Sequence, residues 1–558
     1  MTDAPTLSLS KDKIRVLMLE GVNDSAIARF EQVGYSNLER LPKALDGQAL
    51  IEAVKGVHIL GIRSRTQITP EVLAAADRLF AVGCFSVGTN QVDLDAAERL
   101  GVPIFNAPFS NTRSVAELVI GEIVMLLRRI FPRSVSAHSG GWDKSASDSH
   151  EVRGKTLGIV GLGRIGMEVA RRARAFGMDL LGHDPFVSAA VAKELGIRLA
   201  GLDDVYAAAD YITLHVGLTP QTTGMINEAS IAKMKKGVRL VNCARGELVN
   251  EADLARALEQ GKVAAAAIDV FAEEPPKNSP LLALPNVVLT PHIGGSTHEA
   301  QEAVGVQIAQ QVKEYLKHGV IQNAVNVPSV SAEEYAVMQP YIVLAERMGA
   351  FLAQVSEGTA EEISIRYSGH IAEWKTELIR NAAIKGILNQ SLEEDEKANL
   401  VNAATIAHDR GLRVLEAHKA KASTGGAGSV LSIFLKSSTE QHQVKGAVLH
   451  GDAPRLLQID GIDVEAPLGR SLIYLRNRDV PGVIGKVGTI LGDEAINIAD
   501  FSLGRPGADA ADHASEHGSE HPREAIAVVH VDGIVPEAVL EKLRKIPAVK
   551  TAKAVRQF

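Results

Sequence analysis

The stretch that decides the fold runs from Thr156 to Asp184 and reads TLGIVGLGRIGMEVARRARAFGMDLLGHD. An apolar run typical of a buried strand leads into GLGRIG and then into a segment with helical spacing. In this context Gly161 permits a tight turn, Gly163 lets the backbone approach a pyrophosphate, and Gly166 allows close packing of helix on strand. The beginning of the helix also favours an anion. The stretch therefore predicts a dinucleotide-binding unit.

Asp184 ends the second strand-like run of this unit. A carboxylate at that position can accept hydrogen bonds from the ribose hydroxyls of the cofactor. The adjoining His183 and Pro185 supply no guanidinium to offset a 2′-phosphate, so the charge favours NAD over NADP. The alternative for Asp184 is an ordinary turn aspartate before a proline.

Strand-like runs alternate with helical stretches on both sides of this unit. After Lys155 the runs are TLGIVG, MDLLGHD, DYITLHV, VRLVNCA, AAAAIDVF and VVLTPHI. This rhythm predicts a Rossmann-like doubly wound parallel sheet, because parallel strands need helical crossovers. The first hundred residues show the same alternation in IRVLML, HILGIRS and LFAVGCFSVGTN, which predicts a smaller α/β unit. Apolar spacing from Ser114 to Ile130 predicts a long helix, capped by Ser114, between the two domains.

Polar side chains follow three of the strand-like runs. Arg245 follows VNCA, Asp269 and Glu274 lie in and after AIDV, and His292 follows VVLTP. Ligands of an open parallel sheet bind at the carboxyl ends of the strands, so we expect these groups to converge. Arg245 can hold a carboxylate, His292 can accept a hydroxyl proton, and Glu274 can orient and stabilise the imidazole. Each is an ordinary solvated residue when taken singly, but together they suit oxidation of a 2-hydroxyacid.

These motifs resemble the D-isomer-specific 2-hydroxyacid dehydrogenases. The resemblance rests on GLGRIG with Asp184, NCARGELVNE, AIDVFAEEP and LTPHIGGST, and covers roughly the first 325 residues. It implies that Arg245, Glu274 and His292 are catalytic, and that Asp269 contacts the nicotinamide carboxamide of NAD. The further cofactor contacts that it implies are Arg164, Ile165, Cys243, Arg245, His292, Gly294 and Gly295.

The family's split architecture is implied as well. It would place a flavodoxin-like substrate-binding domain at residues 1–105 and 296–327, around an NAD-binding domain at residues 106–295. For Cys243, the residue by itself indicates only packing and a cofactor contact.

Two segments of the first domain carry groups that can bind an anion. They contain Arg63, Ser64 and Arg65 after HILGI, and Ser86, Val87, Gly88 and Asn90 in CFSVGTN. Both resemble the phosphoglycerate dehydrogenase branch of the family, in which they hold the substrate. In that branch Lys144, from GWDK, reaches the phosphate, in some members from the neighbouring subunit. The alternative is that Arg63 and Arg65 simply face solvent.

This resemblance implies NAD-dependent oxidation of 3-phospho-D-glycerate to 3-phosphohydroxypyruvate, the first step of the phosphorylated route to L-serine. Two alternatives stay open. One is a dehydrogenase or reductase for an unphosphorylated 2-hydroxyacid such as glyoxylate or hydroxypyruvate, which needs neither the basic cluster nor two extra domains. The other is a non-catalytic, NAD-sensing binding protein with the same fold.

Two further domains are expected in the C-terminal half. Residues 328–462 read as a helix-rich stretch with a few strand candidates, and resemble the α+β intervening domain of the longer phosphoglycerate dehydrogenases. Residues 470–558 follow a βαββαβ order and resemble the ACT module, which binds amino acids between paired copies. That resemblance implies L-serine as a feedback effector at Asn477, Asp479 and Asn497. Read without it, these three are turn and strand-start residues.

An insertion at residues 506–523 departs from the ACT pattern. Its His513, His517 and His521 recur every four residues, but the segment has almost no apolar side chain to bury. We expect a solvated loop there and no metal site.

Composition excludes several classes of protein. The formal net charge of −8 argues against a general nucleic-acid or acidic-membrane binder, and no run approaches the ~20 apolar residues that span a bilayer. Cys84 and Cys243 are too few for a disulfide framework and lack metal-ligand spacing, which fits a reducing cytoplasm. We expect a cytoplasmic homodimer or homotetramer.

Overall fold

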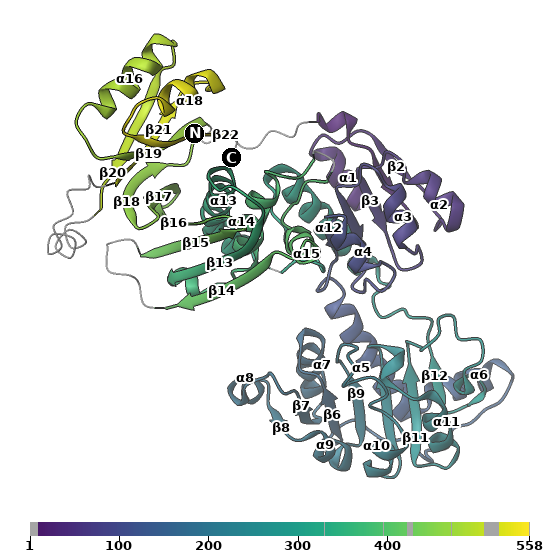
Figure 1. The fold of residues 1–558 in the computed structure, drawn as a ribbon. Coiled ribbons are helices and arrows are strands. Elements are labelled where there is room, and N and C mark those ends of the chain that lie inside the picture. The colour runs from purple at the N-terminus through teal and green to yellow at the C-terminus, as the bar shows by residue number, and fades with distance from the viewer. Residues whose placement is uncertain are drawn as a thin grey trace.

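The computed structural model describes residues 9–328, 330–393, 396–420, 428–469, 471–506 and 524–556, and Figure 1 shows these residues as four bodies, each built on one sheet. The body that contains β6 to β12 stands apart from the other three. It has two hydrophobic clusters of its own, formed by alternate residues of its strands and hence on opposite faces of the sheet. One continuous cluster instead joins Ile14 in the first body to Met348 in the third and Val555 in the last.

The first body is a parallel sheet in the order β2-β1-β3-β4-β5. This is the flavodoxin-like order, as predicted. Its strands are β1 (Val16–Met18), β2 (Leu38–Arg40), β3 (Ile59–Ile62), β4 (Ala81–Cys84) and β5 (Ile104–Phe105). Its helices are α1 (Asp24–Gln32), α2 (Gly47–Ala53), α3 (Pro70–Ala75) and α4 (Leu94–Arg99), together with α12 (His298–His318), which lies against α1, β4 and β5.

The second body is a parallel sheet in the order β12-β11-β10-β9-β6-β7-β8. Its strands are β6 (Thr156–Val160), β7 (Asp179–His183), β8 (Ile197–Leu199), β9 (Tyr211–Leu214), β10 (Val238–Asn242), β11 (Val263–Ile268) and β12 (Val287–Leu289). Its helices are α5 (Thr112–Arg128), α6 (Ile130–His138), α7 (Arg164–Ala175), α8 (Ala189–Glu194), α9 (Leu202–Ala208), α10 (Glu228–Lys233) and α11 (Glu251–Glu259). The chain winds outward from β6 in both directions, which confirms the predicted Rossmann-like fold and puts the switch point between β6 and β9.

The long helix α5 begins earlier than the sequence predicts. It starts at Thr112, so Ser114 lies inside its first turn and is not the cap. The Ser114 hydroxyl forms a hydrogen bond of 2.8 Å with Thr297 Oγ1, at the beginning of α12. The serine therefore connects the two helices instead of capping one of them.

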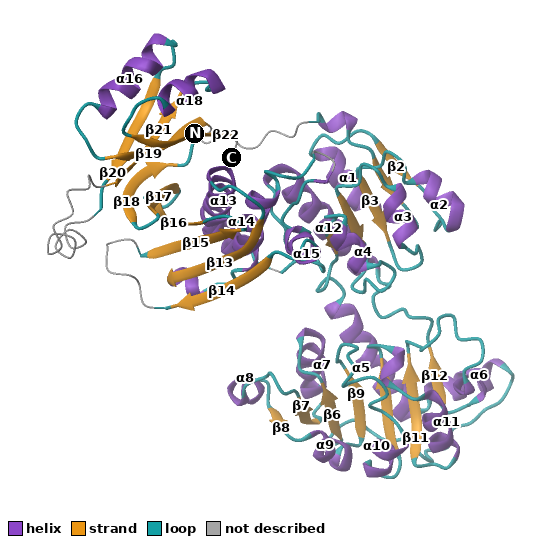
Figure 2. Ribbon diagram, viewed as in Figure 1, coloured by secondary structure: helices purple, strands orange, loops and turns teal. Residues whose placement is uncertain are grey.

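The third body contains more strand than the sequence suggests. Its mixed sheet has the order β14-β13-β15-β16-β17-β18, with α13 against one face (Figure 2). The strands are β13 (Ala360–Gly369), β14 (Arg413–Lys419), β15 (Ser429–Ser437), β16 (Gln441–Leu449), β17 (Ala453–Ile459) and β18 (Ile462–Pro467). The helices are α13 (Ala332–Val355), α14 (Glu377–Leu388) and α15 (Ala403–Asp409). The expectation of a helix-rich stretch was wrong because strands with one solvated face, such as QHQVKGAVL, break up their apolar runs with polar residues.

The last body confirms the predicted βαββαβ order. Its antiparallel sheet runs β20-β21-β19-β22. In chain order its elements are β19 (Ser471–Arg478), α16 (Val483–Asp493), β20 (Ile498–Gly504), β21 (Glu524–Val531), α18 (Glu537–Arg544) and β22 (Val549–Arg556). The histidine-containing insertion lies almost wholly outside the described residues.

The third body also forms hydrogen bonds with the first body at the end of α4. Asn399 Nδ2 donates to the carbonyl oxygen of Gly101 at 2.8 Å, and Thr405 Oγ1 donates to Glu98 Oε1 at 2.6 Å. We call this set of bonds the α4–α15 contact. It ties the C-terminal half to the helix that follows the Ser86–Asn90 segment.

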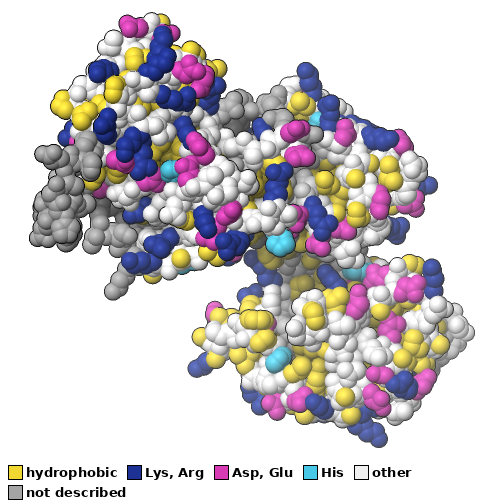
Figure 3. Space-filling view, in the orientation of Figure 1, with side chains coloured by type: hydrophobic (Ala, Val, Ile, Leu, Met, Phe, Trp, Pro, Cys, Tyr) yellow, Lys and Arg dark blue, Asp and Glu magenta, His cyan; other side chains and the backbone are white. Residues whose placement is uncertain are grey.

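The surface carries charges of both signs. Lys and Arg are interspersed with Asp and Glu over the face seen in Figure 3, without a continuous basic stripe on it. Within the described ranges, no helix combines the length and apolarity required to cross a bilayer.

Helices α13 and α14 cross closely because each has a glycine at the contact. A Cβ on Gly386 would lie 2.1 Å from the carbonyl oxygen of Glu346, and one on Gly349 would lie 2.2 Å from that of Ala383. We expect Gly386→Ala to lower the free energy of unfolding by about 1–3 kcal/mol, because the helices must separate. Scanning calorimetry measures this, with Gly488→Ala on α16 as the control: a Cβ there meets no atom within 4 Å, and alanine favours the helix. Equal melting temperatures for Gly386→Ala and the parent chain would contradict the prediction.

Candidate active site

The glycine turn after β6 has the geometry that dinucleotide binding requires. Gly161 has φ +94°, and a Cβ there would lie 2.5 Å from the carbonyl oxygen of His215. A Cβ on Gly166 would lie 2.1 Å from the carbonyl oxygen of Gly161, so the helix can approach only because this side chain is absent. Gly163 caps α7, and a Cβ there would meet no atom within 4 Å. The absence of a side chain at Gly161 and Gly166 therefore permits the tight turn, whereas Gly163 borders open space, as expected for the glycine at which the backbone approaches a pyrophosphate.

Two groups flank this turn. Asp184 accepts hydrogen bonds from the backbone N–H groups of Leu162 and Phe186, each at 2.8 Å. It therefore stabilises both the glycine turn and the turn that spans Pro185. The Arg164 guanidinium lies 3.6 Å from the centre of the Phe109 ring, on the segment that leads into α5. Ile165 follows Arg164 in the first turn of α7.

His292 and Glu274 lie in hydrogen-bond contact, as expected of the acid-base pair that the sequence predicts. Nδ1 of His292 lies 2.7 Å from Glu274 Oε2, and Glu274 Oε1 accepts the N–H of Phe271 at 3.0 Å. The two side chains are 52% and 37% exposed, so they are open to a substrate. His292 has φ +53°, which is unusual for a residue other than glycine and is a feature that clusters at functional sites.

Asp269 fixes the loop that carries His292. Its buried carboxylate accepts the Thr290 hydroxyl at 2.6 Å and the N–H groups of Ile293 and Gly294 at 2.8 Å each. The sequence suggested a nicotinamide contact for Asp269 but not this anchoring of the loop. A Cβ on Gly295 would lie 3.0 Å from Asn111 Nδ2, so the same loop also approaches the residue before α5 closely.

Arg245, which follows β10 of the second body, lies close to a loop of the first body. Its Nη1 donates to the carbonyl oxygen of Ala244 at 2.6 Å, and a Cβ on Gly88 would lie 3.5 Å from its Nη2. The guanidinium therefore lies against the Ser86–Asn90 segment. Both bodies contribute to one site.

The predicted substrate segments are joined by residues that the sequence did not reveal. Glu20 accepts backbone N–H groups from Arg63, Arg65 and Thr66 at 2.9–3.0 Å. Gln91 Nε2 donates to the carbonyl oxygen of Arg63 at 2.6 Å and to the Ser86 hydroxyl at 3.3 Å.

The same contacts decide which groups are left for an anion. Glu20 already accepts the backbone N–H groups of Arg63, Arg65 and Thr66, so these three donors are not available to an anion. Ser64, Arg65 and Asn90 are exposed, and Arg63 is half-buried. The Ser86 hydroxyl donates to the carbonyl oxygen of Gly88 at 2.7 Å, and the carbonyl oxygen of Val87 accepts from Asn106 Nδ2 at 2.6 Å.

Lys144 lies in different surroundings. It is exposed and lines a hollow of about 540 Å³ beside α6, together with Arg128, Arg133 and Trp142. No other predicted site residue lines that hollow. Within one chain, no described contact brings Lys144 to Arg63 or Arg245.

A buried acid lies behind the cofactor side of the site. Glu122, on α5, is 1% exposed, and its Oε2 accepts the Cys243 thiol at 3.1 Å. Burial raises the pKa of Glu122 to about 7, and it also raises the pKa of the Cys243 thiol. A sequence signal existed, since Glu122 lies between Val119 and Leu126 on the apolar face of α5, where an ionisable residue is unexpected.

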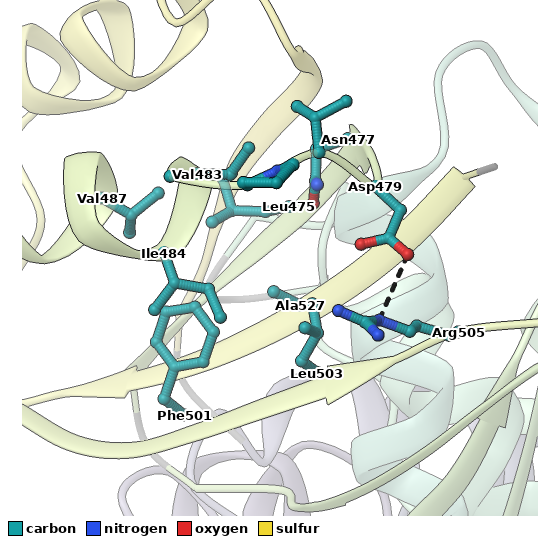
Figure 4. Close-up of a pocket in the computed structure, with 13 residues that line it drawn as sticks. Leu475, Asn477, Asp479, Val483, Ile484, Val487, Phe501, Leu503, Arg505 and Ala527 are labelled. Carbon is teal, nitrogen blue, oxygen red and sulfur yellow. Dashed lines mark ion pairs between the residues drawn. The ribbon is translucent and has the colours of Figure 1, made fainter. Parts of the chain in front are cut away.

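The last body has a hollow of about 500 Å³ that contains two of the three predicted regulatory residues (Figure 4). Asn477 and Asp479 line it, and Asp479 already forms an ion pair of 3.2 Å with Arg505. Asn497 lies elsewhere and donates to Asp532 Oδ2 at 2.7 Å. Apolar side chains make up much of the remaining lining, among them Leu475, Ile484 and Phe501. Arg505 is the charged residue of this hollow that the sequence did not suggest.

The different surroundings of Gly163 and Gly166 yield a prediction about the dinucleotide turn. Gly163→Ala should fold normally but weaken NADH binding by about tenfold or more, because the new methyl group occupies the space of the pyrophosphate. Gly166→Ala should lower the melting temperature, because its methyl group would overlap the carbonyl oxygen of Gly161. NADH fluorescence titration and thermal melting of both variants separate the two effects. Unchanged NADH affinity in Gly163→Ala would contradict the assignment.

Three parts of the chain match known families. Residues 120–294 match the D-isomer specific 2-hydroxyacid dehydrogenase, NAD binding domain. Residues 337–460 match the D-3-phosphoglycerate dehydrogenase intervening domain, and residues 471–548 match the ACT domain.

Relatives and solved structures agree with these matches. The D-3-phosphoglycerate dehydrogenase of Methanocaldococcus jannaschii is 38% identical over 543 residues, covering 97% of this chain and 99% of the relative. That of Bacillus subtilis is 37% identical over 494 residues, covering 88% and 91%. The apo D-lactate dehydrogenase of Escherichia coli aligns with a TM-score of 0.51 at 29% identity, over 56% of this chain and 99% of that chain. The chain therefore belongs to the D-isomer-specific 2-hydroxyacid dehydrogenase family, in the D-3-phosphoglycerate dehydrogenase form that carries an intervening domain and an ACT domain.

Proposed function

We propose that the chain oxidises 3-phospho-D-glycerate to 3-phosphohydroxypyruvate with NAD, as the first step of the phosphorylated route to L-serine. The observation that carries this proposal is that Arg245, Glu274 and His292 follow the neighbouring strands β10, β11 and β12, and that Arg245 lies against the first body. The His292–Glu274 pair and the Arg245 guanidinium lie on one side, and the loop around Gly88 lies on the other. Relatives that match almost the full length of the chain are D-3-phosphoglycerate dehydrogenases.

Each group of this site has a chemical role in the proposed reaction. Arg245 holds the substrate carboxylate through its guanidinium, close to the Ser86–Asn90 segment. Glu274 engages Nδ1 of His292, so Nε2 is the nitrogen left to accept the proton of the substrate hydroxyl. Bound NAD would supply the hydride acceptor for the carbon that carries this hydroxyl. The Glu274 carboxylate then stabilises the imidazolium that has formed.

Basic side chains bind the phosphate of the substrate in this proposal. Arg63 and Arg65 lie on the segment that Glu20 fixes, and they present guanidinium groups without needing the backbone donors. Lys144 would come from a second subunit. Trp142, beside it, is 84% exposed, and Ile130, Phe131 and Val135 on α6 are 43–51% exposed, so this face suits a homodimer or homotetramer.

The ACT domain gives the enzyme an amino-acid effector site, and we propose L-serine as the effector. Asp479 suits its ammonium group, and Asn477 lines the same hollow. Asn497 would act from a paired ACT module. The location we propose is the cytoplasm, where the free thiols of Cys84 and Cys243 remain reduced.

A substrate comparison tests the proposed function. NADH absorbance should rise with 3-phosphoglycerate and NAD, far faster than with glycerate or lactate, and added L-serine should slow it. His292→Asn should lower kcat by about 100-fold or more, because the base is lost, while the dissociation constant for NADH stays nearly unchanged. Equal rates with glycerate would point to an unphosphorylated substrate, and the absence of turnover with any acid would point to a cofactor-sensing protein.

The two arginines of the substrate segment provide a separate test. Arg63→Ala combined with Arg65→Ala should raise KM for 3-phosphoglycerate about 10- to 100-fold, because charge-assisted hydrogen bonds to the phosphate are lost. The dissociation constant for NADH should change little. Arg29→Ala, at an exposed position of α1, is the matched control and should leave both constants unchanged. An equal effect of the double substitution on substrate and cofactor would contradict the phosphate role.

A further inference from the structure

The carboxyl group of Glu122 is almost completely withdrawn from water, yet it makes only one hydrogen bond. The side chain is 1% exposed, and Oε2 accepts the Cys243 thiol at 3.1 Å. Among the described residues, Oε1 has no hydrogen-bond partner. A buried polar atom without a partner costs free energy, so its presence in a helix otherwise suited to packing calls for a reason.

The surroundings of Glu122 act on its pKa in opposite directions. Burial raises its pKa to about 7, the hydrogen bond from Cys243 opposes this rise, and the negative charge of Asp269 adds to it. The charged side chains of the neighbouring helices are engaged elsewhere. On α7, Glu168 pairs with Arg172, which also reaches Glu117; on α6, Arg133 pairs with Asp143. Cys243 and Asp269 are thus the two ionisable groups that act on Glu122.

The same two groups form the link between Glu122 and the cofactor. Cys243 follows β10 and Asp269 follows β11. The family resemblance implies that Asp269 contacts the nicotinamide carboxamide and that Cys243 also contacts the cofactor. Glu122 touches Cys243 directly. The nicotinamide ring is positively charged in NAD⁺ and uncharged in NADH, so a nearby carboxylate is favoured by the oxidised form alone.

We propose that Glu122 senses the redox state of the cofactor: its carboxyl group gives up a proton when NAD⁺ binds and keeps it when NADH binds. This proposal rests on the cofactor position that the proposed function assumes. Glu122 is then a positioning residue that acts on the ring through charge and through the Cys243 contact. Its effect is to strengthen binding of the oxidised cofactor relative to the reduced cofactor.

Linkage fixes the sign of the effect. A ligand that lowers the pKa of a group binds more tightly where that group has already lost its proton. The affinity for NAD⁺ should therefore rise as the pH increases towards 7 and level off above it. With a pKa of about 7 in the free protein, the dissociation constant for NAD⁺ should fall about tenfold between pH 6 and pH 8. The dissociation constant for NADH should change little over the same range.

The experiment compares NAD⁺ and NADH binding between pH 6 and pH 8, in a full-length chain that carries His292→Asn. That background removes the imidazole of His292, the acid-base group that the proposed function places close to the same ring. Desolvation lowers the pKa of His215, whose backbone lies beside Gly161, to about 4, so this side chain stays neutral throughout. Calorimetry in buffers of different ionisation enthalpy gives both the dissociation constants and the number of protons released.

Two variants assign the effect to Glu122. Glu122→Gln in this background should lose the pH dependence of NAD⁺ binding and bind NAD⁺ about tenfold more weakly at pH 8, with NADH binding unchanged. Glu117→Gln lies on the same helix but is exposed and paired with Arg113, so it should retain the parent behaviour. If Glu122→Gln does not fold, Cys243→Ala serves instead. Loss of the thiol donor should move the pH transition for NAD⁺ upwards.

The number of protons released on cofactor binding decides the proposal. Release of about half a proton on NAD⁺ binding at pH 7, with none on NADH binding, supports the proposal if Glu122→Gln abolishes it. Equal proton release for both cofactor forms, or a Glu122→Gln variant that keeps the parent pH dependence, overturns it. If the unmodified chain oxidises 3-phosphoglycerate but NAD⁺ binding releases no proton from Glu122, the proposed function stands and only the redox-sensing proposal fails. If the unmodified chain does not oxidise 3-phosphoglycerate, the proposed function is rejected independently.

Discussion

The hydrogen bonds to the buried carboxylate of Asp269 are the interaction on which the geometry of the candidate active site depends. Its two oxygens accept three hydrogen bonds from Thr290, Ile293 and Gly294, on both sides of His292. The backbone N–H of His292 also donates to the carbonyl oxygen of Asp269 at 2.8 Å. One residue at the end of β11 therefore sets the path of the neighbouring loop, including the left-handed conformation of His292. Only with that path fixed can Glu274 reach the imidazole.

The distribution of the hydrophobic cores shows which parts of the molecule belong together. The first, third and last bodies share one continuous cluster, whereas the NAD-binding body has two clusters of its own. The candidate active site draws on both units, since Arg245 comes from one and Gly88 from the other. A change of angle between the units would therefore alter the distance between these residues while leaving each core undisturbed.

Much of the fold and of the site could be predicted because local signals carried them. The tight turn after β6 requires glycine at positions 161 and 166, and Arg245, Glu274 and His292 follow recognisable strands. The residues that escaped prediction have partners far away in the chain. Glu20 binds a segment 43–46 residues later, and Glu122 meets Cys243 across 121 residues. No periodicity or motif encodes such pairs. The strands of the third body were underestimated for another reason, because one of their faces is solvated and interrupts the apolar pattern.

The α4–α15 contact bears on how the C-terminal half could be gained or lost in evolution. Asn399 and Thr405 bind the end of α4, and Tyr335 and Met338 of α13 belong to the same core as Ile308 of α12. Deleting everything beyond α12 would leave a carbonyl group without its partner and an apolar surface facing water. A shortened descendant would have to rebuild that surface with polar side chains before it could persist as a soluble enzyme. The two C-terminal bodies thus follow α12 in the sequence but share a hydrophobic core with the first body.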